Sequence, residues 1–225
     1  MIMLSHKKIL PPQNEVILRN EVVQRVNKAK FLGVIVDQHL NWKDHISMIT
    51  QKIFKSCGII YRIRNTLDII SKTQIYYCLI HPYLTYCVNV WTSTYRTNLK
   101  IFYTAQKRSV RALFAPSQRP HSRDIFLNQK ILHPDKLINQ QEGILAYNVI
   151  NITYLLGDIL TDRHELDHYQ LRNYGNLRIP LRSTTDSQLF IRYRAIKTWN
   201  SLPSDLRTAS SLSSFRNKLT LMLHQ

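Results

Sequence analysis

The chain has 225 residues, of which 44% are hydrophobic, and it carries a formal net charge of +17 at pH 7. This length and apolar content predict a folded protein with room for two modest domains, and they argue against disorder of the whole chain. The opening residues lack the apolar core of a signal peptide and no run approaches about 18 apolar residues, so we expect a nuclear or cytoplasmic protein that is not secreted and does not contact a membrane.

Positive charge is concentrated in residues 46–120. This segment holds 11 of the 31 Lys and Arg residues, and Asp68 is its only acidic residue. Such a concentration attracts phosphate backbones, and binding through it weakens as salt is added. The alternative interpretation is a solvated surface that keeps the protein soluble.

Residues 31–46 combine a strand pattern with the start of a helix. The apolar run in residues 31–36 is interrupted by Gly33, which predicts a sheet strand with a bulge or a close backbone approach. Asp37 ends this strand. Asn41 and Asp44 resemble a capping pair, because an Asn side chain accepts from a free amide and an acidic residue is favoured in the first turn of a helix.

Three helices are predicted between residues 46 and 114. The second opens at a capping box formed by Ser71 and Gln74, and Pro82 kinks or ends it. In the first and third helices, apolar residues recur at helical spacing and the cations fall on other faces. The predicted outward cations, which are our candidate phosphate contacts, are Lys52, Lys55, Arg62, Lys100, Lys107, Arg108 and Arg111.

Two groups of side chains in this region have a structural and a functional interpretation. Tyr83, Tyr86 and Trp91 could stack on unpaired bases, but residues 82–91 contain no Lys or Arg and several aliphatic residues, which favours core packing. The cysteines show neither a Cys-x-x-Cys pair nor zinc-ligand spacing, and their odd number argues against a disulfide framework. We therefore expect reduced core thiols at Cys57, Cys78 and Cys87.

The last hundred residues predict helices at about 136–150, 186–199 and 211–223, a short strand at 177–181 and a turn at 200–204. A group of acidic and His side chains could ligate a metal, but its spacing matches no established motif and favours a polar surface loop. The group comprises Asp162, His164, Glu165, Asp167 and His168. We expect no metal site and no catalytic residue in the chain.

Four blocks of the sequence, in order, resemble the reverse transcriptases of jockey-type non-LTR retrotransposons. They are residues 31–46, 80–91, 105–114, and 199–207 with 213–219. In the first block, every position of the family pattern is filled: Phe31, Leu32, Gly33, Val34, Asp37, Leu40, Trp42, His45 and Ile46.

The resemblance implies an architecture and a partner. Residues 1–45 would be the end of the palm, 46–115 a basic helical thumb-like module and 116–225 a mostly helical C-terminal region. The fold would be mainly α, with a small β hairpin or sheet remnant at the N-terminus. Leu32, Gly33 and Val34 would correspond to the primer grip, although Gly33 could equally be an ordinary bulge. The thumb cations would hold the phosphate backbone of RNA or of an RNA/DNA duplex.

The catalytic motifs of that family are not found in this sequence. The family's palm aspartates hold two Mg²⁺ ions, usually in an aromatic-Ala-Asp-Asp turn, whereas no two acidic residues are adjacent here. We therefore expect a truncated, catalytically inactive fragment of an RNA-directed DNA polymerase that binds no cofactor itself. The alternative is a host-adopted basic helical protein that binds RNA or protein partners without polymerase activity.

Overall fold

The computed structural model describes residues 17–19, 21–115, 121–151, 176–177 and 179–224. Two short antiparallel hairpins come first, β1 (Ile17–Leu18) with β2 (Glu21–Val22) and β3 (Lys28–Phe31) with β4 (Val34–Asp37). The helices that follow are α1 (Lys43–Ile63), α2 (Ile69–Ile75), the π-helical η1 (Tyr76–Ile80), α3 (His81–Thr85), α4 (Val88–Trp91), α5 (Arg96–Phe114), α6 (Ser122–Asn128), α7 (Pro134–Asn151), α9 (Thr185–Leu189), α10 (Ile191–Asn200), α11 (Ser204–Arg207) and α12 (Leu212–His224). The expected fold class, mainly α with a small β hairpin at the N-terminus, is confirmed.

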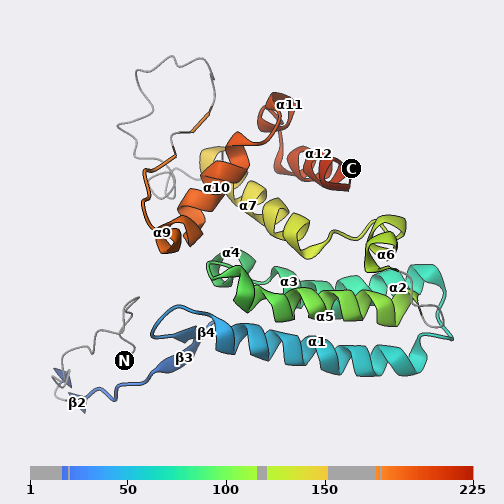
Figure 1. Ribbon diagram of the computed structural model, residues 1–225, viewed down its shortest axis with the longest axis horizontal. Coiled ribbons are helices and arrows are strands. Elements are labelled where there is room, and N and C mark those ends of the chain that lie inside the picture. The colour runs from blue at the N-terminus through green and yellow to red at the C-terminus, as the bar shows by residue number, and fades with distance from the viewer. Residues whose placement is uncertain (1–16, 20, 116–120, 152–175, 178, 225) are drawn as a thin grey trace.

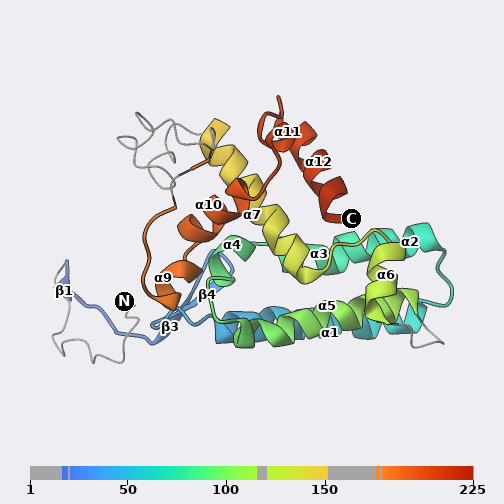
Figure 2. The same cartoon turned by 45° about the horizontal axis from the view of Figure 1, so that its top comes forward.

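The helices α1 and α5 lie side by side and run in the same direction (Figures 1 and 2). Two parallel helices need a return connection, and α2, η1 and α3 provide it by running back along them. The apolar stripes of these elements meet in one hydrophobic cluster, which includes Ile53, Leu84, Trp91, Phe102 and Leu113. The inward positions predicted for the first and third helices are therefore confirmed.

The segment before α1 is held by the carboxylate of Asp37. This side chain accepts from the backbone amides of His39, Asn41 and Trp42 at 3.0, 3.1 and 2.9 Å. Asn41 accepts in turn from the amide of Lys43 at 3.0 Å, and Asp44 lies in the first turn, as predicted. The predicted capping pair is nevertheless wrong in its position, because the N-cap residue of α1 is Trp42, which makes no side-chain cap hydrogen bond. Asp37 thus joins the end of the hairpin to the start of α1.

The strand predicted over residues 31–36 is wrong in its topology. Leu32 and Gly33 form a two-residue turn between β3 and β4, with φ angles of 45° and 83°. Two-residue hairpin turns of type I′ need positive φ at both central residues, and Gly33 supplies one without strain. The sequence resembles one strand because apolar residues flank the turn on both sides.

Further details differ between sequence and structure. The cap of α2 is Asp68, whose carboxylate accepts from the amides of Ile70 and Ser71 at 3.2 and 3.3 Å, so the predicted capping box at Ser71 and Gln74 is wrong. Asp is among the strongest N-caps, and it comes first in the chain. Pro82 lies in the first turn of α3, directly after the π-helical η1, because a proline ring disrupts a regular α-helical turn before it.

In the C-terminal region, the helix predicted at 186–199 is two helices, since Phe190 is extended with φ −63° and ψ 141°. Residues 177 and 179–181 form no strand. The acidic and His group at 162–168 lies outside the described residues. Cys78 is exposed, contrary to the expected core thiol, whereas Cys57 and Cys87 are partly buried against the first cluster.

A second hydrophobic cluster joins the later helices to α7. It contains Tyr147, Ala195, Trp199, Phe215 and Leu219, and the rings of Tyr147 and Phe215 stack with centroids 4.6 Å apart. The N-terminal half of α7 belongs to the first cluster and its C-terminal half to the second. The predicted domain boundaries at 45/46 and 115/116 stay predictions. Across the described ranges, no helix is both long and apolar enough to cross a bilayer.

Candidate nucleic-acid interface

The structure places most of the predicted phosphate contacts on the surface of α1 and α5. Lys55 and Arg62 each follow a buried isoleucine by two positions, and two residues turn a helix by about 200°, so both point away from the core. On α5, Lys100, Arg108 and Arg111 are exposed, whereas Lys107 is partly buried. We call Lys52, Lys55, Arg62, Lys100, Lys107, Arg108 and Arg111 the seven cations.

Two of the seven cations contact aromatic rings of neighbouring elements. The ammonium of Lys52 lies 5.5 Å from the centre of the Tyr83 ring in α3, and the guanidinium of Arg108 lies 5.2 Å from the centre of the Phe54 ring in α1. Such contacts hold a cation in place while leaving it charged. Because Lys52 and Arg108 also pack against the fold, their loss would affect both charge and structure.

The seven cations make no ion pair with a carboxylate in the part of the chain that the structure describes. The ion pairs nearby use other residues, namely Lys28 with Asp44 at 3.4 Å and Arg96 with Asp135 at 3.9 Å. The positive charge of α1 and α5 is therefore available to an external anion. It is carried by the exposed positions of two helices that lie side by side.

The predicted primer-grip residues lie at the tip of the β3–β4 hairpin. The side chain of Leu32 is 74% exposed, whereas Val34 is buried against the first cluster. The hydroxyl of Tyr86 donates to the carbonyl of Leu32. A Cβ added at Gly33 would lie 3.5 Å from Cε1 of Tyr86, so the turn rests directly on this ring.

A cavity of about 590 Å³, which we call the tip cavity, joins this hairpin to α1 and α3. Its lining includes Gly33, His45, Lys52, Tyr83 and Tyr86. The structure thus brings together two predicted site residues, Gly33 and Lys52, which come from the hairpin turn and the first half of α1. It does not bring the α5 cations into this cavity.

The aromatic residues interpreted as core packing have three different environments. Trp91 is fully buried, which confirms that interpretation, and Tyr83 is partly buried. Tyr86 is 53% exposed at the cavity, so core packing is wrong for this residue. Its hydroxyl needs a polar partner and finds one at the hairpin turn, a long-range contact with no signal in the local sequence.

His45 is a cavity residue that the sequence analysis named only as a position of the family pattern, without a role at the site. Its Nδ1 accepts from the backbone amide of Ile35 at 3.3 Å, which leaves the proton on Nε2. Nε2 is buried and has no hydrogen-bond partner among the described residues. Burial lowers the pKa of His45, and the nearby Lys52 lowers it further, so the neutral ring is favoured.

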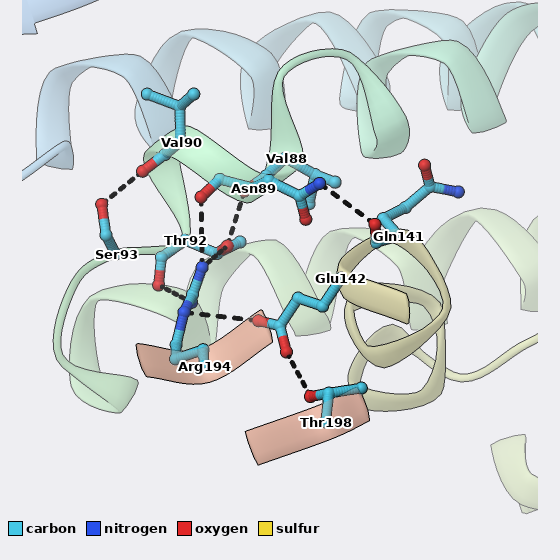
Figure 3. A network of polar contacts seen from close by, with 9 residues as sticks. All are labelled: Val88, Asn89, Val90, Thr92, Ser93, Gln141, Glu142, Arg194 and Thr198. Carbon is cyan, nitrogen blue, oxygen red and sulfur yellow. Dashed lines mark hydrogen bonds and ion pairs between the residues drawn. The ribbon is translucent and has the colours of Figure 1, made fainter. Parts of the chain in front are cut away.

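A polar network on α10 uses an arginine in a different way (Figure 3). The guanidinium of Arg194 donates to the carbonyls of Thr92 and Asn89 at 2.7 and 3.1 Å and to the Thr92 hydroxyl at 3.1 Å. Its Nε lies 3.3 Å from Oε1 of Glu142, whose other oxygen accepts from Thr198 at 2.8 Å. This network connects α10 and α7 to α4 and to Thr92, the residue that follows it.

The charges in this network are largely buried. The side chain of Glu142 is 5% exposed and that of Arg194 is 17% exposed. Burial raises the pKa of Glu142, while Arg194 and the Thr198 hydrogen bond oppose the rise. Arg194 is therefore committed to the fold and is not free to bind an external phosphate.

Potential metal ligands are scattered over the described part of the chain. No three His, Cys, Asp or Glu side chains come close enough to hold a metal ion within the described ranges. The group at 162–168 is outside those ranges.

Comparison with known proteins finds sequence similarity to one class of enzyme. No family model matches it, and no solved structure matches it either. It is 27% identical over 120 residues to the RNA-directed DNA polymerase from the mobile element jockey of Drosophila funebris, a match that covers 52% of this chain and 13% of that protein. It is 21% identical over 110 residues to the probable RNA-directed DNA polymerase from transposon BS of Drosophila melanogaster, covering 48% of this chain and 12% of that protein.

The matched segment is thus about half of this chain and a small fraction of each relative. The resemblance inferred from the four sequence blocks is confirmed at that level. The chain is similar, over about half of its length, to the RNA-directed DNA polymerases of non-LTR retrotransposons.

Proposed function

We propose that this chain corresponds to a part of a non-LTR retrotransposon polymerase that follows the catalytic palm motifs, and that α1 and α5 bind the phosphate backbone of RNA or of an RNA/DNA duplex. The observation that carries the proposal is the set of seven cations on two parallel helices, none paired with a described carboxylate. The similarity to RNA-directed DNA polymerases supports the choice of nucleic acid as the anion.

The dimensions of the surface suit a duplex. From Lys100 to Arg111, α5 rises by about 16 Å, at about 1.5 Å per residue. Double-stranded DNA carries one negative charge per about 1.7 Å of axis, so a duplex segment of this length carries on the order of ten phosphates, of which one side faces the helix. Cations at helical spacing touch phosphates without reading bases, and we therefore propose binding with little sequence preference.

The tip cavity lies at the end of α1 that adjoins the hairpin. We propose that Leu32, Gly33 and Val34 form a primer-grip-like tip, in which Lys52 and Tyr86 border the duplex end. The rigid turn supports this proposal, because positive φ at Leu32 and Gly33 and the Tyr86 contact fix the position of the tip.

We also propose that the chain does not itself transfer nucleotides, since its sequence has no adjacent acidic pair to hold two metal ions. A nuclear or cytoplasmic location and no cofactor of its own are part of the same proposal. No observation specifically favours the host-adopted alternative.

The test uses fluorescence anisotropy with a labelled RNA/DNA heteroduplex at low salt. One variant combines Lys55→Ala, Lys100→Ala and Arg111→Ala, three exposed cations without aromatic contacts. Its matched control combines Arg182→Ala, Lys197→Ala and Lys218→Ala, which removes the same charge from exposed positions elsewhere. We expect the first variant to bind at least about tenfold more weakly and the control to stay within about twofold of the unmodified chain.

Equal losses in both variants would show that total charge, and not the α1 and α5 surface, determines binding. No binding by the unmodified chain at low salt would contradict the proposal. A primer-extension assay with Mg²⁺ forms a separate arm: incorporation abolished by chelation would contradict the proposed lack of catalysis.

A further inference from the structure

A second cavity, of about 410 Å³, lies between η1, α3, the start of α7 and α12. Thr85 and Gln141 line both this cavity and the tip cavity, so the two are neighbours. The volume falls within the range of about 300 to 1,000 Å³ that is usual for small-molecule sites. We call it the basic cavity because of the residues that follow.

The ionisable side chains of the basic cavity include no acid. Lys130, Arg216, His81 and His224 line it, and no Asp or Glu does. Within the described part of the chain, neither Lys130 nor Arg216 forms an ion pair. Four ionisable side chains, two from α12, one from α3 and one from the segment after α6, therefore line a space that no described carboxylate neutralises.

One wall of the same cavity is aromatic. The rings of Tyr77 and His81 lie 5.1 Å apart, and those of Tyr76 and Tyr77 lie 5.2 Å apart. Tyr76 is fully buried, whereas Tyr77 is 45% exposed. Planar rings at a partly open wall provide a surface on which a base can stack.

The polar groups behind these walls are held by hydrogen bonds within the protein. The Gln106 amide donates to the Tyr76 hydroxyl at 2.7 Å and to the Leu132 carbonyl at 3.0 Å. The Gln140 amide donates to the Thr220 hydroxyl at 2.6 Å, which joins α7 to α12. These bonds fix the polar groups behind the walls before any ligand enters, which reduces the entropy lost on binding.

We propose that the basic cavity binds a phosphorylated nucleotide, with the phosphate between Lys130 and Arg216 and the base against Tyr77 and His81. The nucleotide could be free or could be one unit of a single strand that reaches the cavity past Gln141. Neither form depends on the duplex-binding surface of α1 and α5, because none of the seven cations lines this cavity.

The test measures binding of adenosine 5′-monophosphate, adenosine and octathymidylate to the full chain by calorimetry. The key variant is Arg216→Ala, and its control is Lys218→Ala, which removes the same charge from the same helix at a position outside the cavity. Circular dichroism verifies that both variants are folded. A second variant, Tyr77→Leu, removes the stacking ring and keeps an apolar side chain.

We expect Arg216→Ala to weaken phosphorylated-probe binding at least about tenfold, Tyr77→Leu to weaken it several-fold, and Lys218→Ala to leave it within about twofold. Binding of the monophosphate identifies a free-nucleotide site, and binding of octathymidylate alone identifies a strand site; both support the proposal. Adenosine binding as tight as the monophosphate, equal losses in Arg216→Ala and Lys218→Ala, or no probe binding at about 5 mM would overturn it. The Lys55, Lys100 and Arg111 variant should keep monophosphate binding, which separates this test from that of the duplex surface.

Discussion

Arg111 in α5 and Arg194 in α10 belong to amphipathic helices of the same basic chain, yet they lie in opposite environments. Arg111 is exposed and has no described carboxylate partner, whereas Arg194 is mostly buried, forms an ion pair with Glu142 and donates hydrogen bonds to Thr92 and Asn89. The same guanidinium group is thus available to an external anion in one region and used by the fold in the other. A net charge of +17 does not distinguish these uses; burial and partners do.

The largest effect expected from this comparison is on stability. Arg194→Ala should lower the free energy of unfolding by about 3 kcal/mol or more, because it leaves the Glu142 carboxylate buried without its cation. The matched control, Lys197→Ala, removes an exposed cation from the same helix and should change it by at most about 0.5 kcal/mol. Urea denaturation measures both values. A loss below about 1 kcal/mol in Arg194→Ala would mean that the network is not a structural connection.

The hairpin tip should show a smaller effect. Gly33→Ala should cost about 1 to 2 kcal/mol of unfolding free energy, because Gly33 has a φ of 83° that other residues rarely adopt. The control is Gly58→Ala, since Gly58 lies within α1 and a Cβ there would meet nothing within 4 Å. Gly58→Ala should be neutral or stabilising by up to about 1 kcal/mol. Equal effects at the two glycines would contradict the rigid turn.

Lowering the pH should reduce the stability of the folded chain, because His45 in the tip cavity becomes protonated. Burial first, and Lys52 second, lower the pKa of this side chain in the folded chain, so between that value and about 6.5 the unfolded chain binds more protons. The stability contributed by neutral His45 is therefore complete above about pH 6.5 and is lost as the pH falls. Burial also lowers the pKa of His81, His133 and His224, which act in the same direction.

His45→Gln isolates the contribution of His45, because Gln can accept from Ile35 without titrating. Denaturation at several pH values between about 7.5 and 5.5 should show a shallower decline for this variant than for the unmodified chain. An identical decline, or greater stability in acid, would show that His45 is not held neutral.

The sequence predicted what local patterns determine. The isoleucines of α1, the stripe of Leu99 and Phe102 in α5 and the bond from the Lys43 amide to Asn41 all follow from spacing along one segment. The turn at Leu32 and Gly33 was not predicted, because the apolar residues before and after it form a continuous run that resembles a single strand. Asp68 was not predicted as the N-cap of α2, because Ser71, another favoured capping residue, follows it by three positions.

The site depended on contacts that spacing does not reveal. The outward positions of Lys55, Lys100 and Arg111 followed from helical periodicity. The Tyr86 bond to Leu32 spans 54 residues, and the Arg194 bonds to Thr92 span 102. Such pairs form only when separate elements pack. The tip cavity, the basic cavity and the structural role of Arg194 could therefore not be predicted from the sequence.

The salt dependence of duplex binding tests the central claim most directly. The logarithm of affinity for an RNA/DNA heteroduplex is measured against the logarithm of salt concentration for the unmodified chain and two triple variants. The first replaces Lys55, Lys100 and Arg111, and the control replaces three exposed cations elsewhere, Arg182, Lys197 and Lys218.

Each lost phosphate contact should reduce the steepness of this plot by about 0.7 to 0.9. We predict a slope shallower by roughly two to three for the first variant, an unchanged slope for the control, and the same affinity when the base sequence is altered. An unchanged slope in the first variant, or an equal reduction in the control, would contradict the assignment of α1 and α5 as the backbone-binding surface.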